Sequence, residues 1–167
     1  MTGRATGKVT DLTAAVHDPR QLLGRWLLRR RLIDRRAGRG GSVTGVLDVV
    51  EHGTGLRWAE QGELRWGALR TPVRRTTVLS PEPDGWWMHF ADGRPFHPWR
   101  PGEWVEHPCA ADLYRGYVRL ALAEPVAERM WVVWDVQGPA KDQRIFTEFV
   151  RPPGLGTGTP RPGDDRA

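Results

Sequence analysis

Two histidines and two nearby proton-transfer groups are the residues whose types and spacing could do chemistry. His97 and His107 lie on neighbouring segments, and Asp112 and Tyr114 follow closely. Together they could supply a general base, an orienting carboxylate and a phenol donor. The histidines could also give nitrogen ligands to a metal or to haem iron. Their spacing matches no diagnostic metal pattern, so structural histidines that bond backbone groups are the more common interpretation.

Two charged residues occupy positions that alternation would place on inward strand faces. Arg30 lies between Leu28 and Leu32, and Glu60 follows Trp58 in the same phase. Because a buried charge is unfavourable unless it is paired, we expect Arg30 and Glu60 to meet inside the protein or to face a polar ligand there. The alternatives are a purely structural ion pair and a register shifted by one residue, which would expose both side chains.

Cys109 and Lys141 are candidates for nucleophilic or proton-transfer roles. Cys109 follows His107 by two residues, which places both on one face of a strand. A lone cysteine is more often an inert apolar residue. Lys141 is one of only two lysines, with Lys8, in a chain that otherwise uses arginine. It could serve where arginine cannot, as in Schiff-base chemistry, or simply belong to a turn after Gly138-Pro139.

The charge balance is basic without pointing to a nucleic-acid partner. The net charge is +5, and arginine is concentrated between Arg20 and Gly40. Nucleic-acid platforms usually interleave such charges with exposed aromatic side chains. The aromatic residue of this stretch, Trp26, stands where a core residue is expected. A solvated hairpin is therefore favoured over nucleic-acid contact.

Length and composition indicate one globular domain. The chain has 167 residues, of which 39% are hydrophobic and 27% charged, and a single cysteine excludes an internal disulfide. No apolar run has the length of a membrane span, and the first residues lack a signal-peptide pattern, so we expect a cytoplasmic protein with no membrane partner. We expect a flexible arm over 1–17, a folded domain over 18–151 and a disordered tail over 152–167.

Alternating apolar residues dominate the folded span and predict an all-β protein. A short helical turn is predicted after Asp18-Pro19, ending at Gly24. About nine or ten short strands follow, joined by tight turns such as Asp92-Gly93. A sandwich or an antiparallel up-and-down barrel would fit. The barrel is favoured because closure removes exposed edges and because nine tryptophans need a wide interior. The strands are predicted at 26–34, 43–49, 56–60, 64–69, 73–79, 86–91, 94–99, 114–122, 130–136 and 145–151.

Gly24-Arg25-Trp26 at the start of the first strand, with Arg151 at the end of the last, resembles the lipocalin-like (calycin) barrels. In that family a Gly-x-Trp on the first strand packs beneath an arginine from near the last. The resemblance implies a cation–π contact that seals one end of the barrel.

Over about Leu22–Arg151 the chain also resembles an uncharacterised bacterial and fungal family, a domain of unknown function with such a barrel. The most specific segments are Asp92-Gly93-Arg94-x-Phe96-His97 and Gly138-Pro139-x-Lys141-Asp142. Gln143 replaces the aromatic residue usual after Lys-Asp, and Pro98-Trp99 replaces an acidic-apolar pair. These departures suggest a different ligand preference. The family implies a fold but no reaction.

These observations predict a small-molecule-binding barrel whose ligand is partly apolar and carries a polar or anionic group. The expected ligand-binding residues are Arg30, Trp58, Glu60, Arg94, Trp134 and Lys141, with the tryptophans stacking on the ligand and the cations neutralising it. The alternative is a cofactor-independent isomerase, cyclase or hydrolase in the same cavity, with His97 or His107 as acid/base. Haem binding through a histidine is a further alternative; no cofactor or metal is otherwise predicted, and the oligomeric state is left open.

Overall fold

The computed structural model describes residues 18–123 and 126–153, and the predicted arm and most of the predicted tail lie outside these residues. The described chain begins with a 3₁₀ turn, η1 (Pro19–Leu22), as predicted. The Asp18 side chain accepts a hydrogen bond of 2.9 Å from the backbone N–H of Arg20 and so caps the turn. Gly24 follows with φ of +111°, a conformation that glycine adopts without strain.

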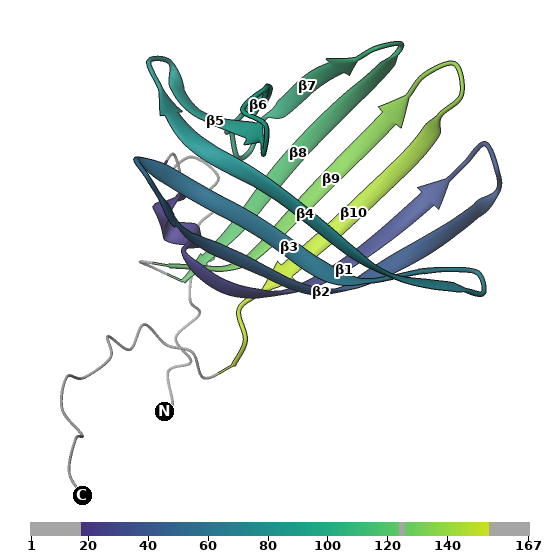
Figure 1. Cartoon of the computed structure of the whole chain (residues 1–167), viewed down its shortest axis with the longest axis horizontal. Helices are drawn as coiled ribbons and strands as arrows, with labels where there is room; N and C mark the ends of the chain where they lie inside the picture. The colour runs from purple at the N-terminus through teal and green to yellow at the C-terminus, as the bar shows by residue number, and fades with distance from the viewer. Residues whose placement is uncertain (1–17, 124–125, 154–167) are drawn as a thin grey trace, which may run out of the picture.

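Ten antiparallel strands form one sheet that curls into a nearly closed up-and-down barrel (Figure 1), which confirms the predicted fold class. The hydrogen-bonded order is β6-β5-β4-β3-β2-β1-β10-β9-β8-β7, so each hairpin pairs with the next and β1 pairs with β10. The strands are β1 (Gly24–Asp34), β2 (Arg39–His52), β3 (Gly55–Trp66), β4 (Leu69–Glu82), β5 (Gly85–Phe90), β6 (Pro95–Pro98), β7 (Trp104–Cys109), β8 (Asp112–Ala123), β9 (Val126–Gln137) and β10 (Asp142–Val150).

Several strands are longer than predicted, and at two places the strands themselves differ from the sequence prediction. The segments predicted separately at 56–60 and 64–69 mostly form one long strand, β3, which turns at Gly67 into β4. Gln61 and Glu63 hide this continuity, because both are exposed on the outer face. Strand β7 was missed, because Pro108 interrupts its pattern and proline fits only an edge strand.

The barrel wall has a seam between β6 and β7. These strands are the two ends of the sheet, and no ladder joins them in the described part of the chain. Pro95 and Pro98 on β6 and Pro108 on β7 lack the N–H groups that such a ladder would need. Aromatic side chains fill the seam instead, since the rings of Phe96 and His107 lie 4.9 Å apart, edge to face. The tube is therefore closed partly by side chains rather than by backbone pairing.

Unlike this seam, the end of the barrel beside η1 is closed by tight packing around Trp26. The Arg151 guanidinium carbon lies 4.0 Å from the centre of the fully buried Trp26 ring. The same guanidinium donates hydrogen bonds to the carbonyl oxygens of Gln21, Leu23 and Ala127 at 2.7 to 3.1 Å. The predicted cation–π contact is thus confirmed, and it ties the start of the barrel to its last two strands. No helix among the described residues has the length and apolar character needed to cross a membrane.

Candidate functional site

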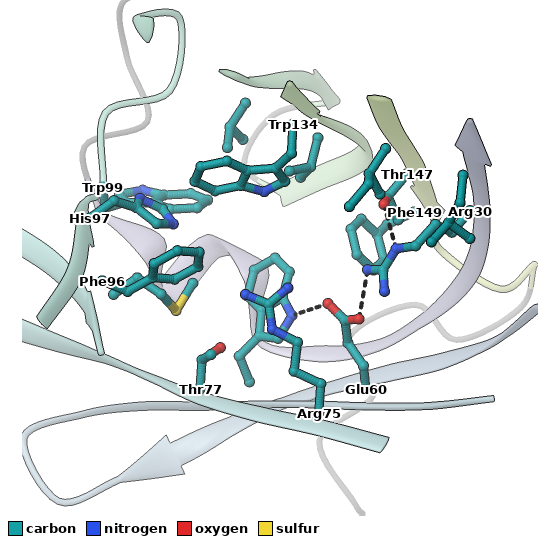
Figure 2. Close-up of a pocket in the computed structure, with 16 residues that line it drawn as sticks. Arg30, Glu60, Arg75, Thr77, Phe96, His97, Trp99, Trp134, Thr147 and Phe149 are labelled. Carbon is teal, nitrogen blue, oxygen red and sulfur yellow. Dashed lines mark hydrogen bonds and ion pairs between the residues drawn. The ribbon is translucent and has the colours of Figure 1, made fainter. Parts of the chain in front are cut away.

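The barrel encloses a cavity of about 120 Å³, whose wall is mostly aromatic and aliphatic (Figure 2). Its polar side chains come from β1, β3, β4, β6 and β10. Several buried aromatic residues form the wall: Trp58, Phe96, Trp99, Trp134 and Phe149. A hollow of this composition, with a few convergent polar groups, is typical of a small-molecule site.

Arg30 and Glu60 meet inside the barrel, as the sequence predicted. The Arg30 Nη2 atom lies 2.6 Å from Glu60 Oε2, and Arg30 Nε donates to the Thr147 hydroxyl at 2.8 Å. The other Glu60 oxygen accepts a hydrogen bond of 3.0 Å from Trp58 Nε1. Both charges of this pair are therefore neutralised within the protein, and the network fixes the Trp58 indole in the cavity wall.

Arg75, on β4, is the cation that sequence reasoning missed. Its side chain points into the cavity in Figure 2, with its guanidinium carbon 5.3 Å from the centre of the Phe96 ring. Among the described residues it has no ion pair or hydrogen bond. Desolvation by the surrounding wall lowers the pKa of Arg75, an effect that Glu60 opposes and Arg30 reinforces. The residue is still exposed, so solvent reaches the cavity on this side.

One signal in the sequence could have identified Arg75. It stands in phase with Val73, Thr77 and Leu79, which all face the interior. The Arg74-Arg75 doublet concealed this phase, because two adjacent arginines in an arginine-rich chain resemble a solvated surface.

His97 lines the cavity as a neutral imidazole. Its side chain is 5% exposed, and Nδ1 lies 2.8 Å from the Pro98 carbonyl oxygen. Because a carbonyl only accepts, Nδ1 carries the proton and Nε2 keeps a lone pair. Desolvation lowers the pKa of His97 to about 4, with Arg75 and His107 lowering it further and the Pro98 carbonyl opposing them. His97 therefore offers a hydrogen-bond acceptor at neutral pH.

Two further polar groups belong to the cavity wall. Trp99 is 4% exposed, and its buried Nε1–H has no hydrogen-bond partner among the described residues. Thr77 is 2% exposed and points toward the same space from β4 (Figure 2). A buried donor without an acceptor is unfavourable, so Trp99 contributes strain rather than an accessible donor to the wall.

A glycine on β8 makes room for the Trp134 indole. Gly116 pairs with Trp134 across β8 and β9, and a Cβ atom on Gly116 would lie 2.6 Å from the indole ring. The indole stacks at 5.1 Å on Phe96, with an angle of 16° between the rings. The two rings lie one over the other in the cavity wall, so each covers part of the other's face.

The other residues of the predicted acid–base group lie apart from the cavity. His107, on β7, packs behind Phe96 and is not among the cavity-lining residues. Asp112 forms an ion pair of 2.6 Å with Lys141, whose Nζ also donates to the Tyr114 hydroxyl at 3.3 Å. The hydrogen bond to Asp112, followed by that to Tyr114, raises the pKa of Lys141. These three side chains link the β7–β8 and β9–β10 hairpins.

Lys141 closes the predicted turn after Gly138-Pro139. The backbone N–H of Gly138 donates to the Lys141 carbonyl at 2.9 Å, and the reciprocal bond is 3.3 Å. The turn interpretation is confirmed. A role for Lys141 in ligand binding stays a prediction, and this lysine does not line the cavity.

Arg94 and Cys109 are also placed on the outside. The Arg94 side chain is 75% exposed and forms an ion pair of 2.8 Å with Asp92 in the β5–β6 turn. Cys109 is exposed at the end of β7, next to Ala110 with φ of +53°. Among residues 18–123 and 126–153, no three His, Cys, Asp or Glu side chains converge as metal ligands.

A second hollow of about 210 Å³ adjoins the cavity. It is lined from β1 to β4 by mainly apolar side chains, including Leu64 and Val73. Arg30, Leu32, Glu60 and Arg75 line both spaces. The Arg75 guanidinium therefore stands where the two hollows meet, and together they provide about 330 Å³.

The fold is similar to a solved structure, that of the S-type phycobiliprotein lyase CPES from Guillardia theta. The TM-score is 0.58 and the sequence identity 12%, and the match covers 80% of this chain and 89% of that one. At this identity the likeness concerns the fold alone. A search of curated proteins finds no match. A family model, described as a family of unknown function (DUF6314), matches residues 22–151. Because this match spans most of the sequence, the chain belongs to the DUF6314 family.

Proposed function

We propose that this protein binds a small, planar, partly apolar anion in the barrel cavity, with Arg75 as the group that receives the negative charge. The observation that carries this proposal is a guanidinium that faces an aromatic cavity without an ion-pair partner among the described residues. Trp58 and Trp134 supply flat walls for the apolar part of the ligand.

The charges of the cavity lining favour an anion over a cation. Arg30 is neutralised by Glu60 at 2.6 Å, which leaves Arg75 as a net positive charge beside the two hollows. A ligand carboxylate would replace part of the hydration that Arg75 loses in the barrel wall, and it could bond bidentately. Arg94 and Lys141, predicted for this task, each pair with an aspartate away from the cavity.

The size of the cavity narrows the class of ligand. An engineered apolar cavity of about 150 Å³ holds one benzene molecule, so a space of about 120 Å³ suits a single ring. A substituent on this ring could extend past Arg75 into the second hollow. Pockets for drug-sized ligands are usually about 300 Å³ or larger, and the two hollows together are only at the lower end of this range. A small aromatic ligand is therefore favoured over haem.

Catalysis without a cofactor is the second candidate function. His97 is the one member of the predicted acid–base group that lines the cavity, and its Nε2 lone pair could accept a proton. The geometry favours binding, because Asp112 and Tyr114 bond Lys141 and neither orients His97. Any turnover would appear as a change in the mass of a ligand incubated with the protein.

Native mass spectrometry of the purified protein, followed by calorimetric titration with benzoate, tests the proposal. We expect a co-purified small acid or direct benzoate binding, with affinity at least about tenfold weaker in Arg75→Met, since removing a charge-assisted hydrogen bond is worth about 1.5 kcal/mol or more. Arg94→Met is the matched control and should bind as wild type does. A Soret band in the purified protein would favour haem instead. The proposal would be overturned if no acid co-purifies and benzoate does not bind. It would also be overturned if Arg75→Met binds benzoate as tightly as the wild-type protein does.

A further inference from the structure

We propose that the ligand is a hydroxyaryl acid, a single aromatic ring that carries an anionic group for Arg75 and a hydroxyl whose O–H donates to Nε2 of His97. This inference rests on the proposed function and specifies its ligand. Arg75 and His97 flank the same Phe96 ring, with the Arg75 guanidinium carbon 5.3 Å and the His97 ring 4.6 Å from its centre. Both side chains also line the same cavity, so one small ligand can reach both.

His97 presents a free acceptor to the cavity. Its Nδ1–H is already used by the Pro98 carbonyl, and no side chain in the described part of the chain donates to Nε2. The ring is held in place by edge-to-face contacts with Phe96 at 4.6 Å and Trp134 at 5.1 Å, so Nε2 cannot easily turn to a different partner. Nε2 is not among the buried atoms left without a partner, so it faces open space, where a ligand hydroxyl can donate to it in place of water.

The charges around His97 keep it an acceptor. Arg75 on β4 and His107 on β7 both disfavour its protonated form, and burial acts in the same direction. The carboxylate of the cavity, Glu60, is already held by Arg30 and Trp58. An imidazolium that could bind a second anionic group is therefore not formed at neutral pH. A ligand with two acid groups would be rejected at this end of the cavity.

The cavity wall is aromatic and offers one free acceptor. Phe96 and Trp134 stack on each other at 5.1 Å, so each ring covers part of the other's face. A ligand that places its hydroxyl on Nε2 of His97 gains a hydrogen bond that its unsubstituted analogue lacks.

The experiment compares benzoate, the three hydroxybenzoate isomers and their methyl ethers by calorimetric titration. In the wild-type protein we expect at least one hydroxybenzoate to bind about tenfold or more tightly than benzoate, and its methyl ether to lose this gain. In His97→Phe the affinities for the hydroxybenzoate, its methyl ether and benzoate should become equal within about threefold, whatever the common affinity is. His107→Phe, a substitution outside the cavity lining, should keep the wild-type preference. His97→Leu repeats the test if near-ultraviolet circular dichroism shows that His97→Phe has lost its native packing.

The results separate this inference from the proposed function. If benzoate binds through Arg75 but no isomer gains from its hydroxyl, or the gain survives in both His97 variants, the hydroxyaryl class is wrong and anion binding stands. If neither benzoate nor any hydroxybenzoate binds, both proposals are wrong. Equal affinity of a hydroxybenzoate and its methyl ether would also overturn the inference, since an ether oxygen cannot donate to Nε2.

Discussion

Replacing Glu60 by Gln tests whether a charge pair inside the barrel holds Arg30. The substitution keeps the size of the side chain and an oxygen that can accept from Trp58 Nε1. It removes the carboxylate that lies 2.6 Å from Arg30, in a pair whose side chains are only 15% and 8% exposed. Removing one partner of a buried pair costs about 3–5 kcal/mol, because the other charge is left uncompensated.

We expect the lower end of this range, a loss of about 3 kcal/mol in the free energy of unfolding. Arg30 keeps its hydrogen bond of 2.8 Å to Thr147, and the adjoining hollows give its guanidinium some access to water. For a domain of this size, the loss corresponds to a fall of about 10 °C in Tm. Because the lining then carries one negative charge less, the same variant should bind benzoate more tightly than wild type does.

Urea denaturation followed by tryptophan fluorescence measures the loss, and calorimetry measures the affinity. Glu63→Gln is the matched control, since Glu63 lies on the same strand and pairs with Arg65 at the surface, where a pair is worth less than about 1 kcal/mol. A Glu60→Gln protein as stable as the Glu63→Gln control would refute the buried pair. Weaker benzoate binding in Glu60→Gln would refute the charge argument for an anionic ligand.

Three further outcomes follow from the structure. The unfolded chain takes up the His97 proton near its ordinary pKa of 6.5, and the folded chain takes it up near 4. The free energy of unfolding should therefore fall by about 3 kcal/mol as the pH drops through this window. Urea denaturation at each pH measures this fall, which should be smaller in His97→Phe. Arg151→Met should destabilise the barrel by about 3 kcal/mol, because it removes the contact with Trp26 and leaves three carbonyl groups without their donor. Thermal melting measures this loss, and an unchanged Tm would contradict it. Lys141→Met should leave benzoate affinity unchanged in calorimetry, because Lys141 bonds Asp112 away from the cavity.

Alternation along single strands predicted an all-β protein and one internal ion pair, and the nine tryptophans and the family resemblance favoured a barrel over a sandwich. Arg30 and Glu60 each interrupt a run of inward apolar residues, and a charge in such a place needs a partner. The prediction did not require knowledge of which strands are neighbours, because β1, β2 and β3 follow one another as simple hairpins. The pattern of residues along each strand is therefore sufficient to predict the hairpins β1–β2 and β2–β3.

The rest of the site depends on contacts across the seam, which no local pattern encodes. His97 lies on β6 and Arg75 on β4, and the side chains of β6 reach the cavity across the barrel from Trp134 of β9, which they contact. His107 has the right chemistry and an adjacent strand, yet Phe96 stands between it and the cavity. Lys141 was a candidate because lysine is rare in this sequence. The scarcity of a residue type does not indicate whether its side chain points toward the cavity, and Lys141 bonds Asp112 instead.

Arg75 distinguishes a binding site from a merely stable interior. The Arg30–Glu60 pair can be explained by structure alone, because each charge compensates the other. Arg75 has no such partner: the barrel wall partly desolvates its guanidinium and lowers its pKa, and no described side chain pairs with it. The residue keeps its exposure to solvent, so this guanidinium is accessible to a ligand that enters the cavity. An accessible unpaired guanidinium and a free imidazole lone pair in one small cavity together describe an anionic ligand with a hydrogen-bond donor.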